Sequence, residues 1–170
     1  MNAMDGSILM WIQEYLTSSI LINLFYCITL LGNGGILWLG YAGYFLIKKE
    51  PKKALIIMIT LLLSSFLTDV ILKNVFMRPR PFVSNSAIVP RIIRPASTSF
   101  PSGHSSTSFA CSFMIAYLDE KKGKLAQVMA GLIALSRLIL CVHYPSDVLC
   151  GILLGIGVAK GLYRIVRKGL

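Results

Sequence analysis

The sequence predicts an all-α, polytopic helical membrane protein: about five transmembrane helices preceded by an N-terminal interfacial amphipathic helix. Of its 170 residues, 55% are hydrophobic and only 14% are charged, and the mean hydropathy is +0.71. The apolar runs are long and continuous, and short basic clusters separate them. This pattern is typical of helical spans, whereas a membrane barrel would show alternating residues.

The N-terminal stretch predicts the amphipathic helix. Apolar residues recur at near-helical spacing from Ile8 to Leu16, and Trp11 and Tyr15 suit the headgroup region. We expect residues 1–19 to lie in the interface, with a short partial span as the alternative. Residues 20–170 then form the transmembrane bundle, and 1–170 make one domain. No cleavable signal peptide is expected, because no basic segment or small-residue cleavage site precedes the first span.

Five apolar runs predict the spans, at 20–47, 54–77, 101–118, 125–141 and 147–163. The first contains Gly32-Asn33-Gly34-Gly35 and then Gly40 and Gly43, which favours close helix packing through small residues. The alternative is a kink near the functional face, with Asn33 hydrogen-bonded inside the bundle. The last span holds four glycines that we also interpret as packing positions: Gly151, Gly155, Gly157 and Gly161.

The net charge of +10 reflects the flanks of the spans rather than a nucleic-acid surface, since basic and aromatic residues do not interleave. Eleven basic residues mark the cytoplasmic side: Lys48, Lys49, Lys52, Lys53, Lys121, Lys122, Lys124, Lys160, Arg164, Arg167 and Lys168. The short segment 119–124 is expected to be a turn there. Six others fall on the outer side, against the positive-inside trend: Lys73, Arg78, Arg80, Arg91, Arg94 and Arg137. These six need another explanation.

The four cysteines lie in apolar runs without the spacing of metal ligands: Cys27, Cys111, Cys141 and Cys150. We interpret them as small buried hydrophobic residues.

One helix start carries one of the two histidines of the chain. Pro101 is expected to open a helix, because proline suits the first helical position. The amides of Ser102, Gly103 and His104 then lack helical partners and make an anion site. Gly103 allows close approach to the backbone, and His104 can move a proton near neutral pH.

Two further helix ends are expected at the same face. Lys73, Arg80 and Pro81 close the second span, while Ser136-Arg137, His143 and Asp147 join the fourth span to the fifth. Ionisable residues inside spans are costly, and this makes them functional candidates.

Together these residues predict a phosphate site with a nucleophile. Arg80 and Arg137 offer planar forks that match a phosphoryl group, and Lys73 offers a point charge. Asp147, one helical turn after His143, can orient that imidazole. One histidine would attack phosphorus while the other protonates the leaving oxygen. Because the sequence shows no carboxylate cluster for a metal, we expect no cofactor and metal-independent chemistry.

In these motifs the chain resembles the type 2 phosphatidic acid phosphatases (PAP2), membrane lipid phosphatases related to vanadium haloperoxidases. The family pattern Lys-x6-Arg-Pro, Pro-Ser-Gly-His and Ser-Arg-x5-His-x3-Asp is present without departure from the second span onward. The resemblance implies that His143 forms a phosphohistidine, that Asp147 supports it and that His104 is the acid for the leaving group. It implies phosphate binding by five residues: Lys73, Arg80, Ser102, Gly103 and Arg137.

The expected function is therefore a bacterial lipid phosphate or pyrophosphate phosphatase in the cytoplasmic membrane, with its active site facing outside. Its partners would be the bilayer and a lipid phosphate, without nucleic acid or metal. Undecaprenyl pyrophosphate is the favoured substrate. Phosphatidylglycerophosphate, phosphatidic acid and a lipid A phosphate are the alternatives. The competing class is a non-enzymatic lipid-phosphate binder or transporter.

Four charged residues that are not themselves defining positions of the motifs keep open interpretations. Arg78 would face lipid headgroups or contact substrate. Arg91 and Arg94 would form a rim that attracts anionic headgroups, or else be solvated loop charges. Asp69 would pair with Lys73 across one helical turn, or else act in the chemistry.

Overall fold

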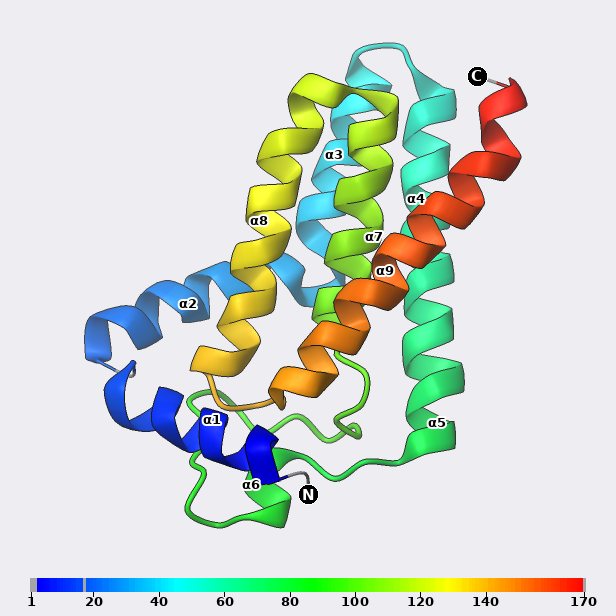
Figure 1. Cartoon of the computed structure of the whole chain (residues 1–170). Helices are drawn as coiled ribbons and strands as arrows, with labels where there is room; N and C mark the ends of the chain where they lie inside the picture. Colours follow the sequence, from blue (N-terminus) through cyan, green and yellow to red (C-terminus); the bar gives the residue numbers. More distant parts are fainter. Residues whose placement is uncertain (1–2, 17, 170) are drawn as a thin grey trace.

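The computed structural model describes residues 3–16 and 18–169, and this part of the chain contains helices and loops but no strand (Figure 1). The predicted boundaries at 1–19 and 20–170 include Met1, Asn2, Thr17 and Leu170, which lie outside the described residues. The α-helices are α1 Ala3–Tyr15, α2 Ser19–Gly32, α3 Ile36–Ile47, α4 Pro51–Ser65, α5 Lys73–Phe76, α6 Pro81–Ser84, α7 Gly103–Leu118, α8 Glu120–Ile139 and α9 Pro145–Val166. The all-α prediction is confirmed.

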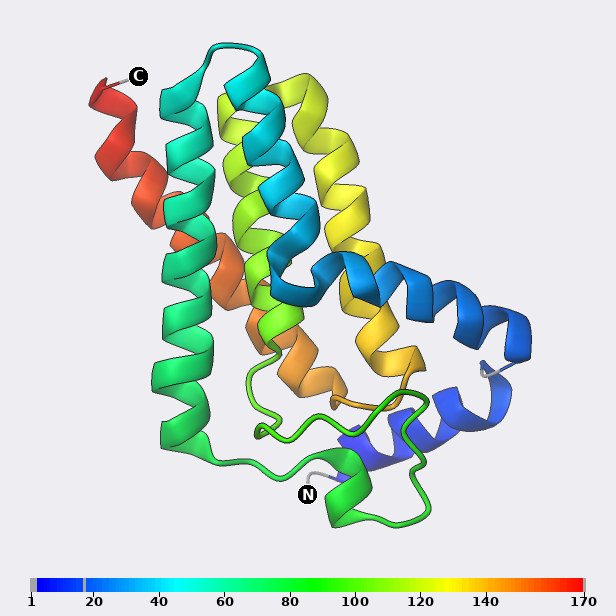
Figure 2. The same cartoon turned by 180° about the vertical axis from the view of Figure 1, so that it is seen from behind.

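Helix α7 occupies the centre of a bundle whose other members are α3, α4, α8 and α9 (Figures 1 and 2). A π-helical segment, Phe66–Leu72, joins α4 to α5 in one long rod. By length and composition, three stretches within the described residues could cross a membrane: Ser19–Ile47, Pro51–Ser84 and Pro145–Val166. Numerous large apolar side chains are exposed on the flanks of the bundle, as expected for a surface that faces lipid.

The first predicted span, 20–47, is not one continuous helix. It breaks at Asn33–Gly35, and α2 runs across the bundle while α3 runs along it (Figure 2). Gly34 and Gly35 have φ of 56° and 72°, a left-handed conformation that glycine adopts without a Cβ penalty. The kink that the sequence left as an alternative is therefore confirmed.

Close packing explains only some glycines of this stretch. A Cβ on Gly32 would stand 2.6 Å from the ring of His104, and one on Gly35 would stand 2.7 Å from Leu61. Gly40 and Gly43 have nothing within 4 Å of such an atom, so the packing interpretation is wrong there.

The glycines of α9 divide in the same way. A Cβ on Gly151 would lie 2.7 Å from the carbonyl oxygen of Ser102, and one on Gly155 would lie 2.3 Å from that of Ser106. These two glycines let α9 touch the backbone of α7, as predicted. Gly157 and Gly161 have open space around them, so they are not packing positions.

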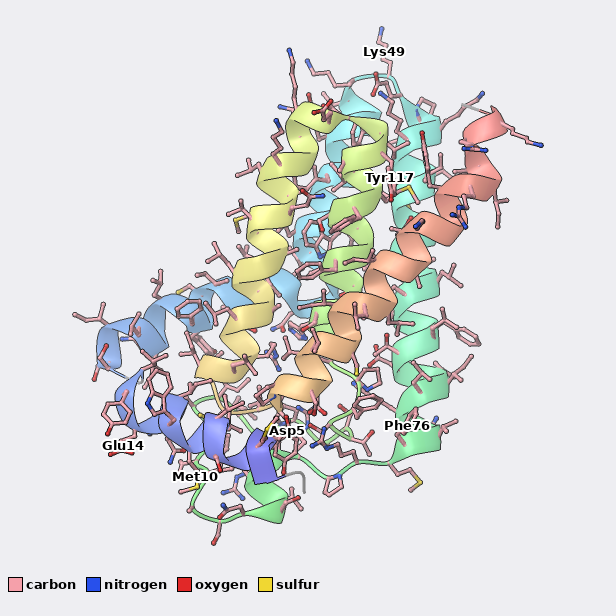
Figure 3. All side chains as sticks on the ribbon, viewed as in Figure 1. Asp5, Met10, Glu14, Lys49, Phe76 and Tyr117 are labelled. Atoms are coloured by element: carbon pink, nitrogen blue, oxygen red, sulfur yellow. The ribbon has the colours of Figure 1, made fainter. Side chains whose placement is uncertain are left out.

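The basic connections and the N-terminal helix lie at opposite ends of the molecule. The α3–α4 turn with Lys49 and the α7–α8 turn are at one end, whereas α1 with Asp5 and Glu14 is at the other (Figure 3). Segment 119–124 is not a free turn: Asp119 caps α8, and its side chain accepts the amide of Lys122. A side-chain acceptor at the N-cap satisfies an amide that lacks a helical partner, and this allows a helix to begin directly after Asp119. Helix α8 therefore begins at Glu120, earlier than the predicted start at 125.

Helix α1 has one buried and one exposed face. Leu9 and Ile12 are buried, whereas Trp11 and Tyr15 are exposed with their ring centroids 5.6 Å apart. The exposed face also carries Ile8 and Met10, and the buried face also holds Asp5, so the amphipathic character of α1 stays a prediction.

The cysteines agree with the prediction except at one position. All four are free thiols; Cys111 and Cys141 are buried and Cys150 is partly buried. Cys27 is exposed on α2, so the prediction of burial is wrong for it.

Candidate active site

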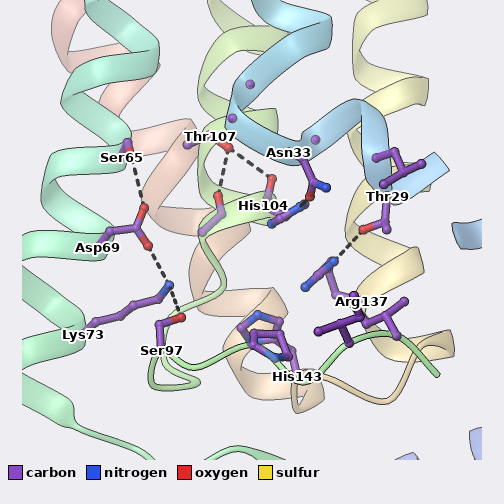
Figure 4. A pocket seen from close by; sticks show the side chains of 18 of the residues that line it. Thr29, Asn33, Ser65, Asp69, Lys73, Ser97, His104, Thr107, Arg137 and His143 are labelled. Atoms are coloured by element: carbon purple, nitrogen blue, oxygen red, sulfur yellow. Dashed lines mark hydrogen bonds and ion pairs between the residues drawn. The ribbon is translucent and has the colours of Figure 1, made fainter. Parts of the chain in front are cut away.

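A cavity of about 560 Å³ opens where the bend after α2, the π-helical segment and the start of α7 meet. Figure 4 shows Lys73 and Arg137 entering it from opposite sides, with His104 and His143 between them. Six residues of the three sequence motifs line this cavity: Lys73, Arg80, Gly103, His104, Arg137 and His143. The fold therefore brings together motifs that lie up to 70 residues apart in the sequence.

His143 lies in the loop between α8 and α9, with its side chain 2% exposed. Its Nε2 is 3.2 Å from Nη1 of Arg80. A guanidinium has no acceptor, so Nε2 must accept this hydrogen bond and the ring proton resides on Nδ1. Burial lowers the pKa of His143 to about 3, against the raising effect of Asp147. The imidazole is thus neutral; His143 lines the cavity, and its Nε2 lone pair is occupied by the N–H of Arg80.

Asp147 stands behind His143, in the first turn of α9 and fully buried. Its Oδ2 is 3.5 Å from Nδ1 of His143 and also accepts the backbone N–H of Tyr144 at 2.9 Å and the hydroxyl of Ser99. Because Nδ1 carries the proton, the carboxylate faces an N–H rather than a lone pair. Ser99 gives no sequence signal, since its segment is irregular.

Arg80 is fixed by acceptors from two loops. Its Nε donates to the carbonyl of Ser97 at 2.7 Å and Nη2 donates to the hydroxyl of Ser97 at 3.0 Å. Its Nη1 donates to the carbonyl of Val142 at 2.9 Å. These contacts orient the guanidinium toward His143 before any ligand arrives, and such preorganisation lowers the cost of binding.

Arg137 comes from the last turn of α8 and is 3% exposed. Its Nη1 donates to Thr29 of α2, whereas its Nε is buried without a hydrogen-bond partner among the described residues. A buried donor without an acceptor is unfavourable, so this group is suited to an anionic ligand. Thr29 is a polar residue inside an apolar run, which is the signal that could have identified it.

Lys73 and Asp69 form the other side of the cavity. The Nζ of Lys73 lies 2.6 Å from Oδ1 of Asp69, so the predicted pairing across one turn is confirmed. Ser65 donates to the second carboxylate oxygen at 3.0 Å. Oδ1 of Asp69 also stands 3.1 Å from the place of a Cβ on Gly103. Glycine at 103 therefore leaves room for this pair.

His104 is oriented by the bend. Its Nε2 lies 2.8 Å from Oδ1 of Asn33, which accepts the ring N–H. This agrees with the alternative that placed Asn33 in a hydrogen bond inside the bundle. The bend after α2 therefore fixes the tautomer of His104, with its Nδ1 free of that proton.

Ser102 does not lie in the cavity wall. Helix α7 begins at Gly103 with Ser102 as its N-cap, two residues later than the expected start at Pro101. The amide of Ser102 donates to the carbonyl of Asp147 at 3.0 Å, and its oxygen accepts from Ser105. Ser102 thus joins α7 to α9, and its contact with phosphate stays a prediction.

The loop arginines divide into three environments. Arg78 is absent from the cavity wall and pairs with Asp5 and Asp147 at 2.8 and 2.6 Å, so neither interpretation of it was right. Arg94 lines the cavity mouth, 5.6 Å above the ring of Phe82. Arg91 lies away from the cavity wall, and its amide donates to Leu140.

Comparison with known proteins gives a family match and two similar folds. The PAP2 superfamily profile matches residues 53–169. The fold is similar to a PAP2 type phosphatidylglycerolphosphate phosphatase from Bacillus subtilis, with a TM-score of 0.83 and 25% identity over 99% of this chain and 88% of that one. It is also similar to LpxE from Aquifex aeolicus, with a TM-score of 0.81 and 23% identity over 93% of each chain. The fold makes this chain an integral membrane protein with helical spans.

Three curated relatives are similar over about half of this chain. Decaprenylphosphoryl-5-phosphoribose phosphatase of Mycobacterium tuberculosis is 36% identical over 51% of this chain and 46% of its own. The bacitracin transport permease protein BcrC of Bacillus licheniformis is 36% identical over 45% and 38%. The putative undecaprenyl-diphosphatase YbjG of Escherichia coli is 39% identical over 48% and 41%. This chain thus spans less than half the length of these relatives.

Proposed function

Since this chain belongs to the PAP2 superfamily, we propose that it is a membrane phosphatase that removes a terminal phosphate from a lipid phosphate or pyrophosphate. One observation carries the proposal. His143 lines a cavity that Arg80, Arg137 and Lys73 surround with positive charge, and its Nε2 lone pair becomes free to attack when a phosphate oxygen takes over the N–H of Arg80. A neutral nucleophile beside fixed cations is what phosphoryl transfer requires.

The proposed reaction has two steps. In the first, Nε2 of His143 forms a bond to phosphorus while the bond from phosphorus to the leaving oxygen breaks. His104 acts here in its doubly protonated form: it gives the leaving oxygen the proton of Nδ1 and keeps the Nε2 proton on Asn33. In the second, water attacks the phosphohistidine, His104 takes its proton, and inorganic phosphate leaves as His143 is restored. Asp147 stabilises the positive imidazole through the Nδ1 proton in both steps.

The phosphate oxygens would be bound by side chains already in place. Arg80 and Arg137 provide guanidinium N–H groups, Lys73 an ammonium, and Gly103 an amide in the first turn of α7. Because these cations neutralise the charge of the transferring group, the proposed reaction needs no metal ion. Ser102 supports the site by holding α7 against α9.

An isoprenoid pyrophosphate such as undecaprenyl pyrophosphate is the favoured substrate. The cavity is walled by apolar residues of α2 and α4, including Leu30, Leu61 and Leu62, so an apolar tail could leave the site sideways. Similarity to the putative undecaprenyl-diphosphatase and to a decaprenyl-linked phosphatase supports this choice. The structural relative from Bacillus subtilis supports phosphatidylglycerophosphate as an alternative, and phosphatidic acid and a lipid A phosphate remain alternatives from the sequence.

The proposed topology has five spans and one orientation. Besides the three apolar stretches, we count α7 and α8 as spans, because α7 lies at the centre of the bundle and α8 packs along it. The basic connections would face the cytoplasm, so the cavity and α1 would lie at the outer membrane surface. Residues 1–19 would lie in the interface, and 1–170 would form one domain.

A lipid-phosphate binder or transporter is the second candidate, favoured by the similarity to a protein named as a bacitracin transport permease. Phosphate release from purified protein in detergent distinguishes the two. The wild type should release inorganic phosphate from a short-chain isoprenoid pyrophosphate in the presence of EDTA, and His143→Ala should release none. Binding without release supports the transporter class, and full activity of His143→Ala rules out the nucleophile.

A panel of substrates then tests the lipid preference. Farnesyl pyrophosphate, dioctanoyl phosphatidic acid, dioctanoyl phosphatidylglycerophosphate and lipid A phosphate should be compared by kcat/KM. A preference for either glycerolipid or for lipid A would overturn the isoprenoid assignment and leave the phosphatase assignment intact.

A further inference from the structure

The carboxylate behind the proposed nucleophile is held from two directions. Oδ2 of Asp147 faces Nδ1 of His143 at 3.5 Å, whereas Oδ1 accepts a hydrogen bond from Nη1 of Arg78 at 2.6 Å. Asp147 has no exposed surface; Tyr144 and Ser99 also donate to its Oδ2, whereas Arg78 is the donor to its Oδ1. A carboxylate with both oxygens bound cannot rotate away from the imidazole without breaking a charge-assisted hydrogen bond.

Arg78 is itself clamped on three sides. Its Nη2 lies 2.8 Å from Oδ2 of Asp5, and its Nη1 also donates to the hydroxyl of Ser146 at 2.7 Å. The guanidinium stacks over the ring of Tyr144, 4.1 Å from the ring centroid. Such cation–π packing fixes the plane of the fork. Arg78 therefore bridges two carboxylates and does not reach the cavity.

Asp5 completes the clamp from α1, outside the stretch that the family profile covers. Its side chain is 7% exposed and accepts the amide and the hydroxyl of Ser146 as well as Arg78. Burial raises the pKa of Asp5, but the hydrogen bonds from Ser146 and Arg78 outweigh it and leave the pKa below its usual value. Asp5 is thus ionised at neutral pH.

The charges of this cluster explain why two carboxylates are needed. Asp5, Arg78 and Asp147 together carry a net charge of minus one. Without Asp5, Arg78 would cancel the charge of Asp147 alone, and little negative potential would remain for the positive imidazole that forms on His143. Within a buried site such unscreened charges act strongly on one another.

We propose that Asp5 and Arg78 are positioning residues that hold Asp147 toward His143 and preserve its negative field, so that α1 is part of the catalytic apparatus. This inference rests on the proposed phosphatase function. Neither residue touches the substrate, so their loss should lower kcat and leave KM nearly unchanged. Misplacement of a catalytic group by about 1 Å can cost on the order of 100-fold in rate.

The test uses the full chain in detergent with a short-chain isoprenoid pyrophosphate. Asp5→Asn removes the charge with little change in shape, and we expect kcat to fall about 10- to 100-fold with KM within about twofold. Glu14→Gln is the matched control, since it makes the same change at an exposed carboxylate of α1 and should keep wild-type kinetics. Arg78→Lys should recover part of the activity that Arg78→Gln loses, because it retains the charge.

A double variant separates positioning from general destabilisation. If the two residues act through one carboxylate, Asp5→Asn combined with Arg78→Gln should lose little more than Arg78→Gln alone. Unfolding temperatures of all variants are measured in parallel. Wild-type kcat in Asp5→Asn, or a loss of activity that follows the loss of folded protein, would overturn the inference.

Failure of the proposed function would look different. In that case the wild type itself would release no phosphate from any lipid substrate, or His143→Ala would remain active. An active wild type, an inactive His143→Ala and an unaffected Asp5→Asn would reject the positioning role alone.

Discussion

The contact between α7 and α9 allows a sharp test of the fold, because a single methyl group should disturb it. A Cβ on Gly155 would lie 2.3 Å from the carbonyl oxygen of Ser106 and 2.8 Å from the amide nitrogen of Ala110. Carbon and carbonyl oxygen are comfortable at about 3.3–3.6 Å, so the two helices must part by about 1 Å in Gly155→Ala. The obstacle is backbone, which cannot rotate away as a side chain can.

The loss of stability in Gly155→Ala can be isolated by comparison with a neighbouring glycine, Gly157. Gly157 has nothing within 4 Å, so Gly157→Ala adds the same methyl group without a clash. Alanine favours a helix over glycine by about 1 kcal/mol, and both variants share this gain. Their difference therefore isolates the overpacking term of about 1–3 kcal/mol. For a chain of this length that is a difference of about 2–12 °C in unfolding temperature.

The separation of α7 from α9 in Gly155→Ala should also disturb the candidate active site. The amide of Ser102 bonds the carbonyl of Asp147 across the same interface, about two turns from Gly155 along α9 toward its start. We expect Gly155→Ala to lose phosphatase activity below its unfolding temperature, whereas Gly157→Ala keeps it. Thermal unfolding and phosphate release in one detergent measure both effects. Equal unfolding temperatures for the two variants would refute the backbone contact.

Three further predictions concern the polar partners of the site. Asn33→Ala removes the acceptor of the His104 ring N–H, so kcat with a lipid phosphate should fall about tenfold or more. The fall in kcat should be smaller with p-nitrophenyl phosphate, because its leaving group needs little protonation. Equal losses of kcat with the two substrates would contradict the role of His104. Thr29→Val leaves Nη1 of Arg137 without its acceptor, so kcat/KM should fall by a factor of roughly 5–30, for about 1–2 kcal/mol. Unchanged kinetics in Thr29→Val would show that Arg137 needs no such anchor. The pKa of Asp5 lies below its unfolded value of 3.8, so the stability it contributes is present above that pH and is lost as the pH falls through the folded pKa. The gap in unfolding temperature between wild type and Asp5→Asn should therefore shrink from pH 7 toward pH 3, and a constant gap would count against an ionised Asp5.

Much of the helical organisation could be predicted from sequence because it depends on local chemistry. Unbroken apolar runs must satisfy their backbone hydrogen bonds within a helix, and Met77 ends the α4–α5 rod where the prolines begin. The bend at Asn33–Gly35 was harder, since the same glycines suit close packing or a left-handed turn. Only the contact of Gly32 with His104 and that of Gly35 with Leu61 show how the bend fits the bundle.

The sequence by itself determined which polar residues are candidates for the site, because their types and spacing within each helix end are local properties. Lys73, Arg80, His104, Arg137 and His143 line one cavity as expected. What only the tertiary structure decided was their partners. Ser97, Thr29 and Asp5 lie 17 to 108 residues from the arginines they bind, and no local pattern records such pairs.

Ser102 and Arg78 show most clearly that the sequence places a residue at the site whereas the tertiary structure determines its partner. Both belong to the motif segments, yet Ser102 bonds the backbone of α9 and Arg78 turns away from the cavity toward Asp5 and Asp147. The reason is that a buried charge or amide binds whichever acceptor the folded chain places beside it. Sequence spacing fixes the order of such groups along a helix, whereas the packing of α1, α7 and α9 chooses the acceptor.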